Sequence, residues 1–493
     1  MDGNSCLDIQ IYDLVQAFDS LWIEDCMNDI FESVPKSEQD DKLALIFEAN
    51  KNNLVAVNTP VGQTERVNIE RIVTQGGTFG PIECANTIDK IGKTCYEQGK
   101  HLYSYKQLVK VMPLSMVDDL LAISTCGQES LALNTYMNTK IELKKLKFHT
   151  PNANGKTKCH KIHVGPKNKL CPQLQVHGTP MVEVDQDTYL GDIVSGDGKN
   201  SKNVKQRVGK GVGIIADILN ILEKVTLGEY YFSTALLLRE ALFINGILTN
   251  AEVWYGLTKK EIQELEDLDC QLLRKILKTK FSVPAESLYL ELGCLNIETI
   301  LKARRINYLH YLTTRKETEM VYKFFLVQWK YPSRNDWTEQ VKIDLEDFGL
   351  KPDLDYIKTK SKEGFKTIVK NKAKEYAFMK FVTKKENHSK LRELFYSELK
   401  TQEYLKNKNL SANQAQTVFS YRTRMSAYSE NFRGTNGHSP CPLCLGHMDS
   451  QAASFQCPEI AQNVQMFTQY GNKYLKLMKS NAIFGLTSCK LRA

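Results

Sequence analysis

Three aspartates directly follow two short apolar runs. Asp13 comes after Ile9-Gln-Ile-Tyr12, and Asp118 and Asp119 come after Leu114-Ser-Met-Val117. Such runs predict β-strands, and we expect the strand ends to present the carboxylates. Oxygen ligands held in this way suit hard cations, and two such ions can activate a primer 3′-hydroxyl and stabilise a leaving pyrophosphate. An Asp-Asp pair by itself is more often an ordinary acidic turn, so the order of the neighbouring motifs matters.

A glycine-rich segment, Gln75-Gly-Gly-Thr-Phe-Gly-Pro81, lies between the two acidic sites. Because glycine has no side chain, the Gly76-Gly77 pair lets the backbone approach a template or an incoming nucleotide closely. Without the flanking motifs, a plain turn is the better interpretation of this pair.

The three segments, in this order, resemble motifs A, B and C of reverse transcriptases, especially those of non-LTR (LINE-like) retrotransposons. Motif A of that family is an aspartate followed by x3-Ala-Phe-Asp, and the segment from Asp13 to Asp19 matches it. Motif B has Gln-Gly and a downstream proline, matched by Gln75, Gly76 and Pro81. The likeness extends over roughly residues 5 to 330.

Motif C of the family is an aromatic or apolar residue, a small residue and Asp-Asp. Here Met116-Val117 stands where Tyr-Ala or Phe-Ala is commoner. The resemblance implies that Asp13 and Asp118 hold two Mg²⁺ ions and that Asp119 assists them. The implied catalytic residues are therefore Asp13, Asp118 and Asp119.

The resemblance also implies roles for neighbouring residues. Phe18 stands where the family has a ring that blocks the ribose 2′-hydroxyl, although an isolated phenylalanine is usually a core residue. Gln75 and Gly76 would contact the nucleotide. Lys140 falls in a segment that resembles motif D, where a lysine could protonate pyrophosphate; a solvated basic helix face is the commoner alternative. Tyr189-Leu-Gly191 resembles motif E, a hairpin that supports the primer end.

Cysteines near the C-terminus have metal-ligand spacing. Cys441 and Cys444 form the Cys-x2-Cys pair typical of tetrahedral zinc, with Cys457 downstream. LINE-like enzymes of several clades carry such a knuckle with a histidine four residues before the last cysteine. Ala453 occupies that position here, so His447 or His438 would have to supply the fourth Zn²⁺ ligand. A knuckle that has lost its metal is the equally weighted alternative.

The predicted fold class is α+β: a polymerase palm with an antiparallel sheet and helices, then a largely α-helical thumb and connection, then a small Cys-rich module. Within the palm, residues 42–53 and 80–98 are predicted helices, and residues 152–169 are a predicted hairpin loop. Helical spacing of apolar residues begins near residue 203 and continues to about 430, with breaks at Pro284 and Pro332. The predicted domains are residues 1–200 (palm), 201–330 (thumb-like), 331–433 (connection), 434–465 (knuckle) and 466–493 (tail).

Basic residues gather in two segments that we expect to contact phosphates. The first is residues 140–169, which includes His149, His160 and His163. The second runs from Lys199 to Lys210. The lysine-rich helices after residue 350 also contain acids, so they are interpreted mainly as solvated faces.

Bulk properties limit the class of protein. The chain has 493 residues, 42% hydrophobic and 25% charged, with a net charge of +8, which permits a polyanionic partner without requiring one. Thirteen scattered cysteines suggest free thiols in a reducing compartment. No signal peptide or membrane-spanning run is evident, so we expect an intracellular protein of the nucleus or cytoplasm.

The favoured hypothesis is an RNA-directed DNA polymerase fragment of a retrotransposon, with an RNA template, a DNA primer or target DNA, and dNTPs as partners. The chain begins almost at motif A, so we interpret it as N-terminally truncated, without the fingers and endonuclease of the family. The alternative is a catalytically inactive nucleic-acid-binding remnant. A two-metal nuclease is a third class, but it would need a further carboxylate cluster that the sequence does not offer.

Overall fold

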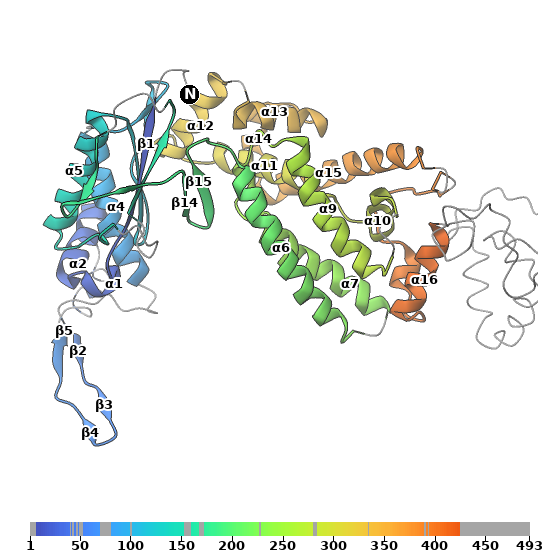
Figure 1. Cartoon of the computed structure of the whole chain (residues 1–493), viewed down its shortest axis with the longest axis horizontal. Helices are drawn as coiled ribbons and strands as arrows, with labels where there is room; N and C mark the ends of the chain where they lie inside the picture. The colour runs from blue at the N-terminus through green and yellow to red at the C-terminus, as the bar shows by residue number, and fades with distance from the viewer. Residues whose placement is uncertain are drawn as a thin grey trace, which may run out of the picture. The chain divides into compact units, whose positions relative to one another are not determined.

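The computed structural model describes residues 6–39, 41, 44–45, 48, 53–69, 80–98, 101–151, 159–166, 172–225, 228–279, 283–333, 335–388, 391–392 and 394–423. The chain divides into two compact units (Figure 1). The first, here called the sheet unit, comprises Met1–Lys199 and Lys316–Tyr331. The second, the helical unit, comprises Asn200–Arg315 and Pro332–Ala493. The mixed α+β class is confirmed.

A five-stranded sheet organises the sheet unit, in the order β13-β10-β1-β9-β8. The central strand β1 (Leu7–Asp13) pairs antiparallel with β9 (Asp119–Thr125) and with β10 (His160–Val164). The edge strands are β8 (Leu114–Met116), antiparallel to β9, and β13 (Val182–Glu183), parallel to β10. Both predicted strands that lead into the aspartates are confirmed.

The two faces of β1 are buried in different ways because successive side chains point to opposite faces. Leu7 and Ile11 pack with apolar residues of β9 and β10 on one face. Tyr12 packs on the other face, in a core formed mainly with helices. The polar side chain of Gln10, also buried, is satisfied there by donating to the Ser130 carbonyl at 2.9 Å.

Helices cover the Tyr12 face of the sheet: α2 (Ile23–Ser33), α4 (Gly80–Gln98) and α5 (Gln128–Leu143) (Figure 1). A short helix, α1 (Ala17–Ser20), follows β1. The predicted helix at residues 80–98 is confirmed. Most of the helix predicted for residues 42–53 lies outside the described residues, and Asn53 begins strand β2. Helix α12 (Met320–Lys330) packs on β7 and belongs to the sheet unit, although it falls within the predicted range 201–330.

The prediction of a loop over residues 152–169 is wrong where the structure describes it, since β10 lies there, beside β1. Its sequence, His-Lys-Ile-His-Val, is polar, but the polar groups are paired inside the fold. Lys161 forms an ion pair with Glu183 at 2.7 Å, and His163 contacts buried Asp8 at 3.0 Å. The polar composition of this segment predicted a loop, whereas the segment forms a strand of the sheet.

Short hairpins complete the sheet unit. The predicted strand near Tyr189 is confirmed as β14 (Gln186–Tyr189), which pairs with β15 (Asp192–Ser195). Leu190 and Gly191 between them both have positive φ, 49° and 83°, as a two-residue type I′ turn requires. The other pairs are β2 (Asn53–Val55) with β5 (Val67–Ile69), β3 (Asn58–Thr59) with β4 (Gly62–Gln63), β6 (Ser104–Tyr105) with β7 (Val109–Lys110), and β11 (Gln175–Val176) with β12 (Thr179–Pro180).

Helices with one continuous apolar core form the helical unit, as the spacing from residue 203 predicts. Pro284 precedes α10 as its N-cap, which accounts for the predicted break there. The helices are α6 (Ser201–Leu222), α7 (Gly228–Leu238), α8 (Asn245–Ile247), α9 (Lys259–Ile276), α10 (Ala285–Leu292), α11 (Ile297–Thr313), α13 (Trp337–Asp347), α14 (Leu354–Thr359), α15 (Lys362–Lys385) and α16 (Ala412–Arg422). A π-helical turn, Arg239–Ile244, connects α7 and α8.

Two cysteines depart from the expectation of free thiols. Cys6, just before β1, is joined by a disulfide to Cys126, just after β9. The antiparallel pairing of β1 with β9 brings these two positions together, with their Cα atoms 5.6 Å apart. The other cysteines in the described part of the chain are free and buried. Among the described helices, none has the length and apolar character needed to cross a membrane.

Candidate functional site

The predicted catalytic carboxylates lie where β1 and β8 end and β9 begins. Asp13, the last residue of β1, is directly opposite Asp119, the first residue of β9. Directly opposed residues of an antiparallel pair point to the same face, with Cβ atoms about 5 Å apart. Both side chains are half-buried, so the site is partly open to solvent.

Asp118 lies in the tight turn between β8 and β9, next to this pair. Met116 pairs with Asp119, so Val117 and Asp118 are the two residues of a hairpin loop. Val117 has a φ of 61°, a conformation that costs a β-branched residue about 1–2 kcal/mol. Backbone strain of this kind persists only where the surrounding structure imposes it, and it is concentrated at functional sites.

Backbone contacts hold the chain on both sides of the carboxylates. The His149 amide donates to the Asp13 carbonyl at 2.8 Å, and the Val15 amide donates to the Lys147 carbonyl at 2.9 Å. On the turn, the Cys84 thiol of α4 donates to the Val117 carbonyl at 3.8 Å. Burial, and then the charges of Cys26 and Asp118, raise the pKa of the Cys84 thiol to about 12, so this group stays protonated.

Tyr12 links the strand to helix α5. Its ring is fully buried, and its hydroxyl donates to Gln10 at 2.5 Å and accepts from the Asn134 amide at 2.9 Å. Burial raises the pKa of Tyr12 far above its ordinary value. This contact fixes β1, and Asp13 with it, against the helical layer.

Tyr189, from the β14–β15 hairpin, lies on the same side of the sheet as the Asp13–Asp119 pair. It packs against the apolar cluster that includes Ile11 and Leu121, and its hydroxyl donates to the Leu114 carbonyl at 3.5 Å. Burial and the negative charge of Asp119 raise the pKa of Tyr189 to about 12. The hairpin that resembles motif E therefore lies close to Asp119.

The other predicted site residues have different positions. Phe18 is on α1, half-buried against the core beneath the helices. Lys140 is in the last turn of α5, 5.4 Å from the Tyr136 ring, and α5 packs on the opposite face of the sheet from the Asp13–Asp119 pair. Gln75 and Gly76 lie outside the described residues.

A metal ion needs several of these oxygen ligands together. Asp13 and Asp119 face one another and fit a hard cation in chemical type and placement. In the described part of the chain, however, no group of three or more His, Cys, Asp or Glu residues is close enough to form a complete metal site. A divalent ion here would need further oxygen ligands, such as substrate phosphates and water.

The predicted zinc ligands Cys441, Cys444, His447 and Cys457 lie outside the described residues.

The predicted basic segments are partly engaged within the protein. His160 contacts Asp187 at 2.6 Å, and Lys144 forms an ion pair with Asp29 at 2.6 Å. In the second segment Arg207 is buried, whereas Lys205 and Lys210 on α6 are exposed. His160 and His163 pair with carboxylates inside the fold, and contact of the first segment with phosphates stays a prediction.

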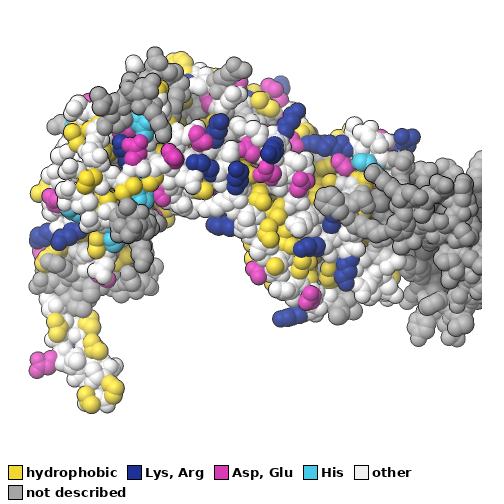
Figure 2. Space-filling view, viewed as in Figure 1, with side chains coloured by type: hydrophobic (Ala, Val, Ile, Leu, Met, Phe, Trp, Pro, Cys, Tyr) yellow, Lys and Arg dark blue, Asp and Glu magenta, His cyan; other side chains and the backbone are white. Residues whose placement is uncertain are grey.

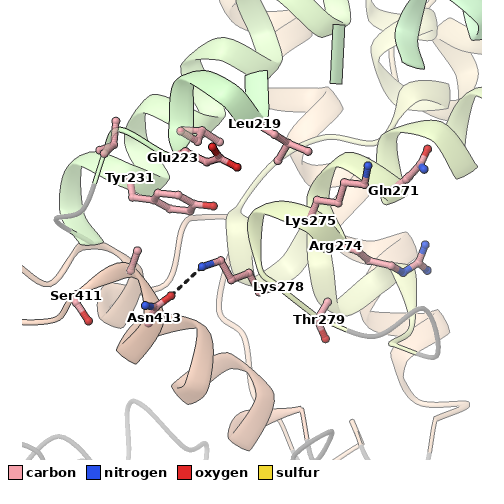
Figure 3. A pocket seen from close by; sticks show the side chains of 13 residues that line it. Leu219, Glu223, Tyr231, Gln271, Arg274, Lys275, Lys278, Thr279, Ser411 and Asn413 are labelled. Carbon is pink, nitrogen blue, oxygen red and sulfur yellow. Dashed lines mark hydrogen bonds between the residues drawn. The ribbon is translucent and has the colours of Figure 1, made fainter. Parts of the chain in front are cut away.

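A separate pocket of about 820 Å³ lies within the helical unit, between the ends of α6 and α9 and the start of α16 (Figure 3). Lys278 points across it and donates to Asn413 at 2.9 Å, while the Tyr231 ring closes one side. Glu223 is the single acid among its lining residues. Because this pocket has no paired carboxylates, the strand-end aspartates remain the better candidate for metal-assisted chemistry.

Comparisons with known proteins identify no family. No family model matches the sequence, and no curated protein matches it. A comparison with solved structures matches, among others, telomerase from Candida tropicalis and telomerase from Candida albicans, each in complex with the TWJ fragment of telomeric RNA. The first is 12% identical with a TM-score of 0.29 and covers 66% of this chain and 49% of that chain. The second is 13% identical with a TM-score of 0.27 and covers 66% of this chain and 50% of that chain.

This chain thus spans about half the length of these telomerase chains. TM-scores this low do not define a shared fold. The class that the fold and the site define is therefore a coarse one: a mixed α+β protein with opposed carboxylates at the end of a largely antiparallel sheet.

Proposed function

We propose that this chain is the palm and helical part of a reverse transcriptase from a non-LTR retrotransposon. In the proposed reaction, the 3′-oxygen of a DNA primer attacks the α-phosphorus of a dNTP on an RNA template. A new phosphodiester bond forms and the bond to pyrophosphate breaks. The primer hydroxyl loses its proton to solvent water, and the leaving pyrophosphate takes one from solvent water.

The observation that carries this proposal is the meeting of the motif A and motif C aspartates. Their motifs are about a hundred residues apart in sequence, yet Asp13 and Asp119 are direct partners across β1 and β9, with Asp118 in the adjoining turn. Independent acidic turns would have no reason to lie opposite one another at strand ends. The strained φ of Val117, beside Asp118, adds support.

The residues have separate roles in the proposal. Asp13 and Asp118 would hold Mg²⁺, with Asp119 assisting. Bound there, two such ions would lower the pKa of the primer hydroxyl and neutralise charge on the phosphates. Phe18, on the helix that follows Asp13, would exclude a ribose 2′-hydroxyl. Lys140 is given no step in this reaction, because α5 packs on the opposite face of the sheet from the Asp13–Asp119 pair. Gln75 and Gly76 would contact the incoming nucleotide.

Primer extension on an RNA template tests the proposal. Wild-type protein should incorporate dNTPs in the presence of Mg²⁺, and Asp118→Ala should reduce incorporation to background. Asp217→Ala, which removes an exposed carboxylate from α6 in the helical unit, is the matched control and should retain activity. Equal extension by wild type and Asp118→Ala would overturn the metal assignment.

A non-catalytic nucleic-acid-binding protein is the second candidate. The exposed lysines on α6 and α15 favour contact with a polyanion whether or not the carboxylates act on a substrate. Salt-dependent binding of RNA or DNA without incorporation, under the conditions of the extension assay, would favour this candidate.

A further inference from the structure

Helix α15 carries a large excess of positive charge. Its 24 residues include eight lysines and two glutamates. Lys and Arg side chains follow α15 on the visible face of the helical unit (Figure 2). A charged helix is often only a solvated surface. Whether α15 could bind a partner depends on how its lysines are arranged and on which of them form ion pairs within the protein.

Four of these lysines form one row. Lys362, Lys366, Lys370 and Lys374 recur at every fourth residue, and all four are exposed. Residues four apart are neighbours on a helix surface, so the four ammonium groups lie along one side of α15. The row runs beside the buried stripe of the helix, whose members are Phe365, Val369, Ala373, Ala377 and Phe381.

Within the described residues, no carboxylate forms an ion pair with any member of this row. Other lysines of α15 do have such partners: Lys372 pairs with Glu375 at 2.8 Å, and Lys380 pairs with Glu298 at 2.5 Å.

One acid outside the helix lies near an end of the row. Lys374 lowers the pKa of Glu398 from a distance, but that carboxylate already binds Lys400 at 2.9 Å. Within the described part of the chain, no member of the row is therefore held in an ion pair, and Glu398 acts only on its Lys374 end.

An unpaired row of this kind has an electrostatic cost. Like charges four residues apart destabilise a helix, and the row contains three such pairs. A polyanion lying along the row would remove this repulsion. The row is about 18 Å long, because each four-residue step rises about 6 Å. A nucleic-acid duplex presents about ten phosphates over that length.

The packing of α15 argues against a membrane surface as the partner. A helix that lies on a lipid bilayer inserts its apolar face. The apolar stripe of α15 is instead buried within the helical unit, where α15 packs on α10 and α11. Only the charged side is available to a partner.

We infer that the row Lys362, Lys366, Lys370 and Lys374 is a docking surface for the phosphate backbone of a nucleic-acid duplex. This inference deepens the proposed function, since it names the surface that would hold the template–primer duplex. It does not depend on the carboxylate site, because binding requires neither Mg²⁺ nor dNTPs.

Equilibrium binding of a labelled RNA–DNA hybrid across a salt series, without Mg²⁺ or dNTPs, tests the inference. The variant replaces all four lysines of the row by glutamine, which retains helix propensity. Each phosphate contact contributes about 0.9 to the slope of log K against log salt, so the slope should become shallower by about 3 to 4. The affinity at low salt should fall by at least about tenfold.

A matched control replaces four exposed lysines elsewhere in the helical unit, Lys224, Lys259, Lys260 and Lys351, by glutamine. This variant has the same net charge and should keep most of the slope. Replacing the row by arginine should also preserve the slope, because it keeps the charges. Circular dichroism of each variant establishes that the helices are intact.

A slope that falls equally in the row variant and in the control would overturn the inference. Polyglutamate binding as tightly as the hybrid, with the same dependence on the row, would also overturn it, in favour of an acidic protein partner. Loss of dNTP incorporation by Asp118→Ala with unchanged binding of the hybrid would leave the row assignment supported. The two proposals can therefore fail separately.

Discussion

Asp13 and Asp119 are direct partners across strands β1 and β9, and their carboxylates point to the same face of the sheet. Two carboxylates held this close repel one another unless a cation or a proton lies between them. Two opposed carboxylates are suited to bind a positively charged group, because carboxylate oxygens are the ligands that hard cations prefer.

Asp119→Asn should therefore stabilise the metal-free protein. Like charges directly opposite one another in a sheet are destabilising, and removing one should raise the free energy of unfolding by about 0.2–1 kcal/mol. Urea unfolding at neutral pH without divalent ions measures the change. Asp217→Asn, at an exposed position of α6, is the control.

Excess MgCl₂ should raise the melting temperature of wild type more than that of Asp119→Asn, and the reverse order would contradict a cation site.

Asp269→Ala should strongly destabilise the helical unit. The Arg239 guanidinium donates to both oxygens of Asp269, at 2.7 and 2.6 Å, and both side chains are fully buried. Removing Asp269 leaves the buried guanidinium with the exposed Glu240 carboxylate at 3.6 Å and the Leu295 carbonyl at 2.8 Å. Breaking a buried ion pair in this way costs about 3–5 kcal/mol. Chemical denaturation measures the loss. The double variant Arg239→Met with Asp269→Leu should lose less than Asp269→Ala alone, and a larger loss would contradict this account.

The free energy of unfolding should fall as the pH rises from about 4.5 to about 7, because buried Glu266 loses its proton at a higher pH in the folded state than in the unfolded state. Burial, together with the nearby charge of Asp269, raises the pKa of Glu266 to about 7, despite hydrogen bonds from Tyr289 and Asn296. The unfolded carboxyl loses its proton near 4.5, whereas the folded one keeps it to about 7, so the folded state binds more protons in this range. The contribution is at most about 3 kcal/mol.

Urea unfolding at about pH 5 and about pH 7.5 measures this dependence. In Glu266→Gln, the difference in unfolding free energy between the two pH values should shrink. An unchanged difference would show that other groups cause it.

Gly293→Ala should destabilise the protein more than Gly349→Ala. Both glycines have positive φ, 67° and 64°, which costs any L side chain about 1–2 kcal/mol. A Cβ at Gly349 would meet open space, whereas one at Gly293 would collide with the Lys400–Thr401 backbone. The collision should add about 1–3 kcal/mol. Thermal unfolding of the two variants makes the comparison, and equal losses would contradict the close approach.

Much of the local structure could be predicted from the residues themselves. The apolar runs before Asp13 and Asp118 predicted strands, and the helical spacing of Ile214, Ile218 and Leu222 predicted α6. These patterns are local, because the side-chain period of a strand or helix is set by its own backbone geometry. The polar strand His160–Val164 was missed, since the carboxylates that pair with its side chains are distant in sequence.

The sequence by itself determined which carboxylates are present, in which motifs and at which strand ends. Tertiary structure decided which of them meet: the register of β1 with β9 places Asp119, rather than Asp118, opposite Asp13, and the β14–β15 hairpin brings Tyr189 to the same face. It also left the lysine row of α15 without acidic partners among the described residues, while it paired Lys380 with Glu298 of α11. Strand register and ion pairing join residues about a hundred positions apart, and no local period encodes such contacts.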